Sequence, residues 1–225
     1  MTGQQPIISR DGDRPTPRHS STQTALHPVG QTIVPKLKGL NVYLIGMMGS
    51  GKSTVGKELA IALGYRFLDT DSLIEQAAAQ PIRQIFAESG ETSFRQLETQ
   101  VLNQVSAYKK MVIATGGGIV LERQNWNFLH YGVSVWLDAP VDVLYERVKG
   151  DRDRPLLKTD DPQKTLQTIL NQRQHLYAQA DVRIPITSSD NPTHVVANIL
   201  AGIQAQLKPD LIPPQPGDFE IRYDS

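Results

Sequence analysis

The stretch Gly46-Met47-Met48-Gly49-Ser50-Gly51-Lys52-Ser53-Thr54 decides the fold of this chain. It matches the pattern G-x-x-x-x-G-K-[ST] in full, follows the apolar run Val42–Ile45 and precedes the helix-compatible run Val55 to Leu63. Glycine lets the backbone turn so that successive N–H groups point inward at phosphate oxygens. A bare glycine-rich loop is more often a plain turn, but a full match between a strand and a helix favours a nucleoside triphosphate site.

Within this loop, two side chains have predicted roles beyond the backbone. The Lys52 ammonium is suited to the β- and γ-phosphates, and the Ser53 hydroxyl is suited to the Mg²⁺ that accompanies a nucleoside triphosphate. Six residues are therefore predicted to bind the nucleotide: Gly49, Ser50, Gly51, Lys52, Ser53 and Thr54.

The composition removes several classes of function. The 225 residues include 23 Lys and Arg and 23 Asp and Glu, so the net charge gives no attraction to nucleic acid or to an anionic membrane. There is no Cys, which excludes disulfides, thiolate metal sites and cysteine nucleophiles and is compatible with a reducing compartment. No apolar run approaches the ~18 residues that span a bilayer. We expect a soluble, monomeric, cytoplasmic protein without a nucleic acid or membrane partner.

Both ends of the sequence are predicted to lie outside the folded domain. Residues 1–36 carry five Pro, several Ser, Thr and Gln, and no sustained apolar periodicity, which indicates a disordered N-terminal tail. Three Arg among Ser and Thr would also fit a plastid or other organelle transit peptide, but Asp11 and Asp13 count against it. Residues 208–225 are rich in Pro and poor in apolar residues, which predicts a flexible C-terminal tail.

Between these tails, residues 37–207 alternate between short apolar runs and helix-length segments, the pattern of βαβ units on a parallel sheet. Five strands are predicted, at residues 42–45, 66–68, 111–114, 133–137 and 182–186. Helices are predicted between and after them, at residues 52–63, 72–79, 82–88, 91–107, 122–130, 141–149, 162–180 and 192–207. The sequence thus predicts one α/β domain.

Two carboxylates, Asp69 and Asp71, come directly after the second predicted strand. The carboxyl ends of parallel strands form the edge where ligands of open α/β sheets bind. In extended backbone a spacing of two residues points both side chains the same way, so one could order Mg²⁺ waters while the other meets an acceptor hydroxyl. The alternative is that Asp71 merely caps the helix that starts at Ser72.

Three glycines and two arginines suggest an acceptor site. Residues 116–118 are all Gly and follow the third predicted strand, where the lack of a Cβ lets the backbone approach a ligand; a flexible turn is the alternative. Arg95 has Glu98 three residues later on one helical face, which can preset the guanidinium fork for a carboxylate. Arg173 could supply a second fork to the same anion. Either arginine alone is more often a surface charge.

A charged loop and a strand end complete the candidate features. Arg154 lies in the loop 151–157, which is typical of a mobile lid that delivers a cation to the transferring phosphoryl group; a solvated loop is the alternative. The run Val133–Asp138 looks like the Walker B strand of ATPases, but Ala139 stands where a hydrolytic ATPase usually carries Glu. No Asn-Lys-x-Asp sequence occurs, which disfavours a GTPase.

Taken together and in this order, the motifs closely resemble the shikimate kinase family of P-loop small-molecule kinases. The resemblance covers about residues 38–207, and the matching pieces are Gly46 to Thr54, Asp69-Thr70-Asp71, Phe94-Arg95-Gln96-Leu97-Glu98, Gly116-Gly117-Gly118, Arg154-Pro155-Leu156-Leu157, and Arg173 with Tyr177. It implies ATP-dependent phosphorylation of the 3-hydroxyl of shikimate, on the pathway to chorismate and the aromatic amino acids. It also implies a three-layer α/β/α fold with a five-stranded parallel sheet, a helical substrate-binding segment at about 70–98 and a lid at about 150–160.

The same resemblance implies a nucleotide role for four residues. Lys52 and Arg154 would contact the ATP phosphates, Ser53 would bind Mg²⁺ directly, and Asp69 would bind it through water. The adenine-contacting loop of the family falls near Asp190, where some relatives carry a basic or Gln side chain.

On the acceptor side, the resemblance implies that Asp71 binds the hydroxyls of shikimate and that Gly117 approaches its ring. Arg95 and Arg173 would clamp its carboxylate. The residues also leave two alternative functions open. One is a related kinase for gluconate or another small hydroxy acid, and the other is a catalytically silent nucleotide-binding module.

Overall fold

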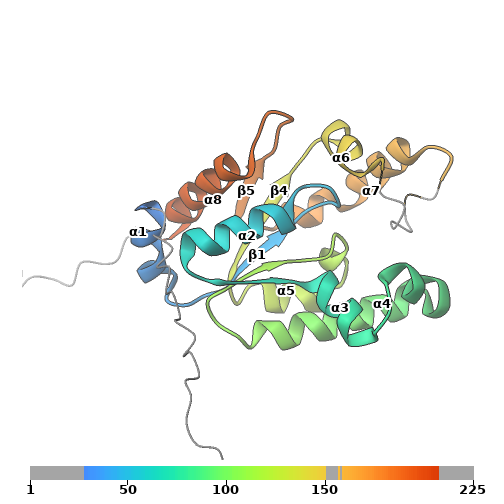
Figure 1. Cartoon of the computed structure of the whole chain (residues 1–225), viewed down its shortest axis with the longest axis horizontal. Helices are drawn as coiled ribbons and strands as arrows, with labels where there is room; N and C mark the ends of the chain where they lie inside the picture. Colours follow the sequence, from blue (N-terminus) through green and yellow to red (C-terminus); the bar gives the residue numbers. More distant parts are fainter. Residues whose placement is uncertain (1–27, 151–156, 158, 208–225) are drawn as a thin grey trace, which may run out of the picture.

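A computed structural model describes residues 28–150, 157 and 159–207 of the chain. Its sheet has five parallel strands in the order β2-β3-β1-β4-β5, with helices on both faces (Figure 1). The strands are β1 (Val42–Ile45), β2 (Arg66–Asp69), β3 (Met111–Ala114), β4 (Val133–Asp138) and β5 (Val182–Pro185). The predicted α/β fold with a five-stranded parallel sheet is therefore confirmed.

Most helices begin and end within a few residues of the predicted bounds. The helices are α1 (Pro28–Leu37), α2 (Lys52–Leu63), α3 (Thr70–Ala78), α4 (Ile82–Ser106), the short 3₁₀ turn η1 (Ile119–Leu121), α5 (Arg123–Leu129), α6 (Val141–Val148), α7 (Pro162–Tyr177) and α8 (Pro192–Gln206). The two exceptions to the predicted bounds are α1 and α4. None of these helices is both long and apolar enough to cross a bilayer.

The central strand β1 shows how the sheet acquires two covered faces. All four of its residues are buried, as expected for a parallel strand with helices on both sides. The Tyr43 hydroxyl donates to Ser106 Oγ of α4 at 3.1 Å, whereas Leu44 lies against Gly56 of α2. Because neighbouring side chains of a strand point to opposite faces, α4 and α2 cover opposite sides of the sheet.

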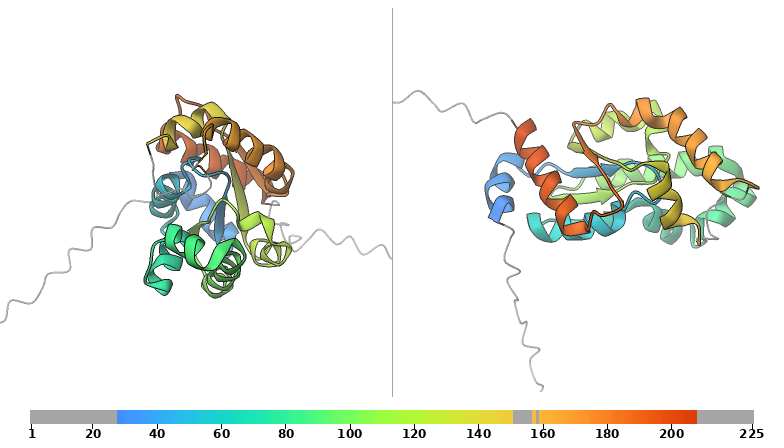
Figure 2. Two further views of the ribbon diagram at one scale, coloured as in Figure 1. Left: turned by 90° about the vertical axis from the view of Figure 1, so that its right-hand side faces the viewer. Right: turned by 90° about the horizontal axis from the view of Figure 1, so that it is seen from above.

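The structure corrects the predicted N-terminal boundary. Helix α1 lies largely within residues 1–36, which were predicted to be a disordered tail, and it contacts α2 and α8 (Figure 2). Ile33 and Leu37 are fully buried there, four residues apart on one helical face. Pro28 and Pro35 suggested a tail in the sequence, but this helix is stabilised by packing rather than by local propensity.

The second exception is a pair of helices predicted at 82–88 and 91–107. They form the two parts of α4, separated by Gly90 with φ 77° and ψ 174°. The predicted substrate-binding segment at 70–98 thus comprises α3, the first part of α4 and the start of its second part, which carries Arg95 and Glu98. Of the predicted lid at 150–160, residues 151–156 and 158 lie outside the described residues, as do residues 1–27 and 208–225 of the predicted tails.

We expect Leu37→Ala to lower the free energy of unfolding by about 2–5 kcal/mol, because it leaves a cavity between α1 and the core. The matched control is Leu40→Ala, since Leu40 is 41% exposed and should lose less than about 0.5 kcal/mol. Urea denaturation measures both. Equal stability of the two variants would show that α1 is not part of the cooperative folding unit.

Candidate active site

The predicted phosphate loop joins β1 to α2 at the carboxyl edge of the sheet. Gly49 and Gly51 have φ of 80° and 96°, in the left-handed region that residues with a side chain rarely adopt. Helix α2 begins at Lys52, so its first N–H groups and the positive end of its dipole face the loop. This is the backbone geometry of an anion site suited to phosphate.

The Lys52 side chain is buried within the loop. Its Nζ donates to the carbonyl oxygens of Gly46 at 2.9 Å and Met47 at 2.8 Å, and lies 3.4 Å from Ser50 Oγ. The ammonium is therefore held where phosphate oxygens could take over some of its contacts.

The two predicted metal ligands meet at the end of β2. Asp69 Oδ2 accepts a hydrogen bond from the Ser53 hydroxyl at 2.6 Å. Asp69 Oδ1 accepts from the backbone N–H groups of Asp71 at 3.0 Å and Ser72 at 3.3 Å, so Asp69 caps α3. The alternative that Asp71 caps this helix is therefore wrong, and Asp71 lies in the first turn of α3 instead.

A cavity of about 280 Å³, here called the phosphate cavity, joins the loop to both carboxylates. Five of the six predicted nucleotide residues line it, and Ser50 lies buried beside it. Its lining consists of Met48, Gly49, Gly51, Lys52, Ser53, Thr54, Asp69, Asp71, Thr115, Gly117 and Arg147. Predicted nucleotide and metal residues thus share one space with two predicted acceptor residues, Asp71 and Gly117, whereas Arg95 and Arg173 are not part of its lining.

Arg147 is a site residue that no sequence pattern indicated. It lies on α6, and its Nη1 donates to the carbonyl oxygen of Gly49 at 3.2 Å. It lines both the phosphate cavity and an adjoining cavity of about 240 Å³. No local motif marks Arg147, because its position depends on how α6 packs beside the loop.

This adjoining cavity is lined by Asp190, Asn191 and Pro192, which belong to the loop where the resemblance places the adenine contacts of the family. Asp190 Oδ2 accepts from the Thr187 backbone N–H at 2.7 Å and its hydroxyl at 2.9 Å, while Oδ1 lies 2.8 Å from His194 Nδ1. The Thr187 N–H and then the His194 ring hold the pKa of Asp190 below its usual range. The cavity is flanked by Pro192 and Val195, which give it an apolar side suited to a planar base.

Three acceptor-side groups converge on the glycine run. A Cβ on Gly116 would collide with the Glu98 carboxylate and would lie 2.7 Å from Asp71 Oδ1. A Cβ on Gly118 would overlap the Arg95 guanidinium. The run is therefore not simply a flexible turn, since the missing side chains make room for charged groups.

The middle glycine connects the acceptor side to the phosphate loop. The Gly117 carbonyl oxygen accepts from Arg173 Nη1 at 3.1 Å and from the Tyr177 hydroxyl at 2.5 Å. A Cβ on Gly117 would lie 3.3 Å from the backbone nitrogen of Met48 in the loop. Arg173 thus lies at the same carboxyl edge of the sheet as the phosphate loop.

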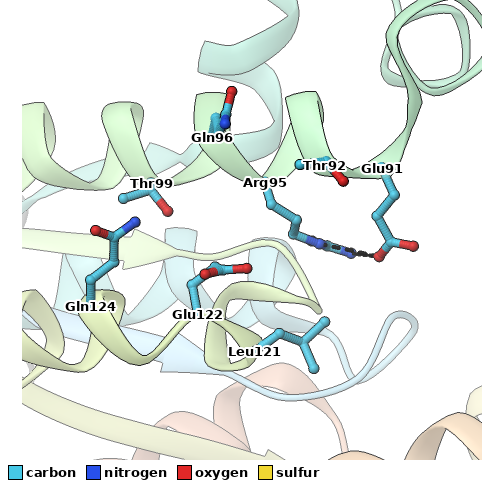
Figure 3. Close-up of a pocket in the computed structure, with 8 residues that line it drawn as sticks. All are labelled: Glu91, Thr92, Arg95, Gln96, Thr99, Leu121, Glu122 and Gln124. Atoms are coloured by element: carbon cyan, nitrogen blue, oxygen red, sulfur yellow. Dashed lines mark hydrogen bonds and ion pairs between the residues drawn. The ribbon is translucent and has the colours of Figure 1, made fainter.

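Arg95 extends from α4, just after the Gly90 kink, and is 8% exposed. Its Nη1 donates to Glu98 Oε2 at 2.7 Å, as the spacing predicted, and its Nη2 donates to Glu91 Oε1 at 2.9 Å. Figure 3 shows the guanidinium directed from α4 toward the segment that carries Leu121. The two carboxylates fix the plane of the fork.

Glu98 has no solvent exposure, and its carboxyl lies among both positive and negative side chains. Burial raises the pKa of its carboxyl to about 7, Arg95 and Arg173 oppose this rise, and Asp71 adds to it. Two guanidinium groups and two carboxylates therefore interact in one water-poor region.

Glu98 should make stability depend on pH. Because the native carboxyl holds its proton to about pH 7 while the ordinary pKa is 4.5, the native state binds more protons in this window and stability falls as pH rises. Relative to Glu98→Gln, the wild type is expected to lose about 3 kcal/mol between pH 4.5 and 7.5. Urea unfolding across this range measures the difference. Parallel curves for wild type and Glu98→Gln would contradict the assignment.

The fold and these contacts define a P-loop kinase of small molecules: a phosphate loop, a carboxylate pair beside it and buried guanidinium groups on the same sheet edge. A sequence model of the shikimate kinase family matches residues 48–204 of this chain. The chain belongs to the shikimate kinase family.

Individual relatives agree with this family. A shikimate kinase of Nostoc sp. is 53% identical over 172 residues, covering 76% of this chain and 95% of the relative. One of Synechococcus elongatus is 50% identical over 177 residues, covering 79% and 93%. Among solved structures, the shikimate kinase of Acinetobacter baumannii in complex with shikimate has a TM-score of 0.72 and 36% identity, covering 78% of this chain and 97% of that one. The Aquifex aeolicus enzyme has a TM-score of 0.62 and 34% identity, covering 74% and 97%.

Proposed function

We propose that this protein transfers the terminal phosphoryl group of ATP to the 3-hydroxyl of shikimate, giving shikimate 3-phosphate and ADP. The observation that carries the proposal is the placement of Arg95 and Arg173 around the glycine run, whose middle residue also lines the phosphate cavity. Two guanidinium forks suit a small acid better than a neutral sugar. Together they orient its hydroxyl toward the phosphate loop.

On the nucleotide side, the loop amides and Lys52 hold and neutralise the phosphates. Ser53 and Asp69 supply hard oxygen donors that fit Mg²⁺, and their 2.6 Å contact puts both at one point. Because Mg²⁺ is usually bound by one or two carboxylates together with substrate phosphates, phosphate oxygens would complete its ligand set. Mg²⁺ held by these residues would neutralise negative charge that develops on the transferring phosphoryl group.

The base would lie in the adjoining cavity between Arg147 and the side formed by Pro192 and Val195. The Arg147 guanidinium can stack on a planar ring while its contact to the Gly49 carbonyl keeps it against the loop. Arg154, which is outside the described residues, is proposed to close over the phosphates from the lid.

On the acceptor side, Asp71 lines the phosphate cavity together with Lys52. We assign Asp71 to the attacking hydroxyl: the hydroxyl oxygen bonds to the γ-phosphorus, its proton passes to Asp71, and the bond to ADP breaks. Asp71 need not be a strong base, because in-line placement and charge neutralisation dominate phosphoryl transfer. Gly117 approaches the ring and holds Arg173 with its carbonyl.

We propose that the protein acts as a monomer. The lack of Cys fits a reducing cytoplasm, which we propose as its compartment.

The function is tested by incubating the full chain with ATP, Mg²⁺ and a panel of acceptors and measuring ADP release. We expect turnover with shikimate and at most background release with gluconate or with no acceptor. Turnover with gluconate but not shikimate would assign a different kinase, and no turnover with any acceptor would leave a nucleotide-binding module.

Lys52→Ala should lower kcat by orders of magnitude, because charge on the transferring group is no longer neutralised. Lys57→Ala, at an exposed position on the same helix, is the matched control and should keep wild-type turnover. Steady-state kinetics at saturating shikimate compare the two. Near-normal turnover of Lys52→Ala would refute the phosphate assignment.

Arg95→Ala should weaken shikimate binding by about 2–5 kcal/mol, since a buried charge partner of the carboxylate is lost. The readout is the KM for shikimate, measured beside the KM for ATP. Arg83→Ala, exposed on the same helix α4, should change neither constant. A rise confined to the KM for ATP would show that Arg95 is misplaced.

A further inference from the structure

Strand β2 is an edge strand of the sheet. Its neighbour is β3, and the described residues place no strand on its other side. The Arg66 backbone N–H donates toward β3, to the Lys110 carbonyl at 3.0 Å. Because backbone groups of successive residues point to opposite sides of a strand, the N–H and C=O of Phe67 face outward. Such an edge is a template for another strand.

A cavity of about 450 Å³, here called the edge groove, lies beside β2 between α3 and α4. It is separate from the cavities of the proposed kinase site. Its apolar lining is made by Leu68, Leu73, Ala77, Val101, Val105 and Met111. An apolar groove next to unpaired strand backbone can accept the alternate side chains of an added strand.

The groove has a basic and aromatic rim at the start of β2. Tyr108 lines it and is 57% exposed, and it is followed directly by Lys109 and Lys110. Arg66 lines the groove and is exposed as well. An apolar occupant with a negative charge at the end that meets the start of β2 would complement this rim.

Residues 218–224 have that chemistry. The sequence Asp-Phe-Glu-Ile-Arg-Tyr-Asp alternates apolar and charged side chains with the period of two that predicts a strand. It contains three acidic residues and one basic residue. The composition of 208–225 as a whole predicts a flexible tail, but this segment departs from it.

The segment also starts within reach of the groove. Helix α8 contacts α2, and α2 contacts β2 on the face opposite the edge groove. The end of α8 is therefore about two elements from the outer edge of β2, or roughly 20 Å at typical packing distances. Since α8 follows the carboxyl end of β5, it returns to the amino edge of the sheet, where Arg66 begins β2 (Figures 1 and 2). The connector 208–217 contains four Pro and can extend about 30 Å at ~3.1 Å per residue.

We propose that residues 218–224 of the same chain pair with the outer edge of β2 as a sixth strand and seat Phe219, Ile221 and Tyr223 over the edge groove. This pairing covers the free edge and supports β2, whose last residue is Asp69. It is independent of the proposed function, because none of these side chains belongs to the kinase site.

Disulfide trapping in the full chain tests the proposal, because the sequence has no Cys of its own. One variant carries Gln76→Cys, in the groove lining, with Ile221→Cys. The matched control carries Gln204→Cys, exposed on α8, with Ile221→Cys. A free tail closes the shorter loop to residue 204 more readily, whereas a docked segment favours residue 76. We expect the first pair to form a monomeric disulfide at least tenfold faster. A faster control pair, equal rates, or a covalent dimer would overturn the proposal.

Hydrogen exchange supplies a second readout on the unmodified chain. The Phe67 amide should exchange at least tenfold more slowly in the wild type than in the triple variant Phe219→Asp, Ile221→Asp, Tyr223→Asp. Equal exchange would overturn the pairing. Neither readout uses turnover, so a chain that traps the disulfide but does not phosphorylate shikimate would refute the proposed function alone.

Discussion

The backbone of Gly116–Gly118 is the constraint on which the rest of the site depends. Side chains at either end of this run would occupy the space of the Arg95 guanidinium and the Glu98 carboxylate. Its middle carbonyl orients Arg173. Because the run is attached to β3 beside the central strand, charged groups from α4 and α7 are positioned against one backbone segment.

Burying these charges is costly, and the structure shows how the cost is partly offset. Arg95 donates to two carboxylates, yet burial still raises the pKa of Glu98 to about 7. A buried ion pair of this kind is weak support for stability. The buried ion pair is better explained by ligand binding. Two guanidinium groups that are already oriented lose little conformational freedom when an anion binds. In the proposed acceptor site, the arrangement of these charges thus favours ligand geometry over native-state stability.

Much of the site could be predicted because its parts are local in sequence. The phosphate loop, the Asp69 and Asp71 pair after a strand, and the spacing of Arg95 from Glu98 each fall within nine residues, where backbone geometry fixes what can meet. Contacts between distant segments could not be predicted in this way. Arg147 reaches Gly49 across 98 positions, and the Gly117 carbonyl meets Arg173 across 56. No local pattern indicates such pairs.

The sequence by itself determined the succession of strands and helices along the chain and the position of the anion-binding loop. Both depend on apolar periodicity and glycine placement, which constrain residues that are close in sequence. Only the tertiary structure decided that α1 belongs to the domain and that Asp69 rather than Asp71 caps α3. The physical reason is the same in both cases. Ile33 and Leu37 gain stability only when α2 and α8 cover them, and the Asp69 carboxylate is held from its second side by Ser53 of another helix.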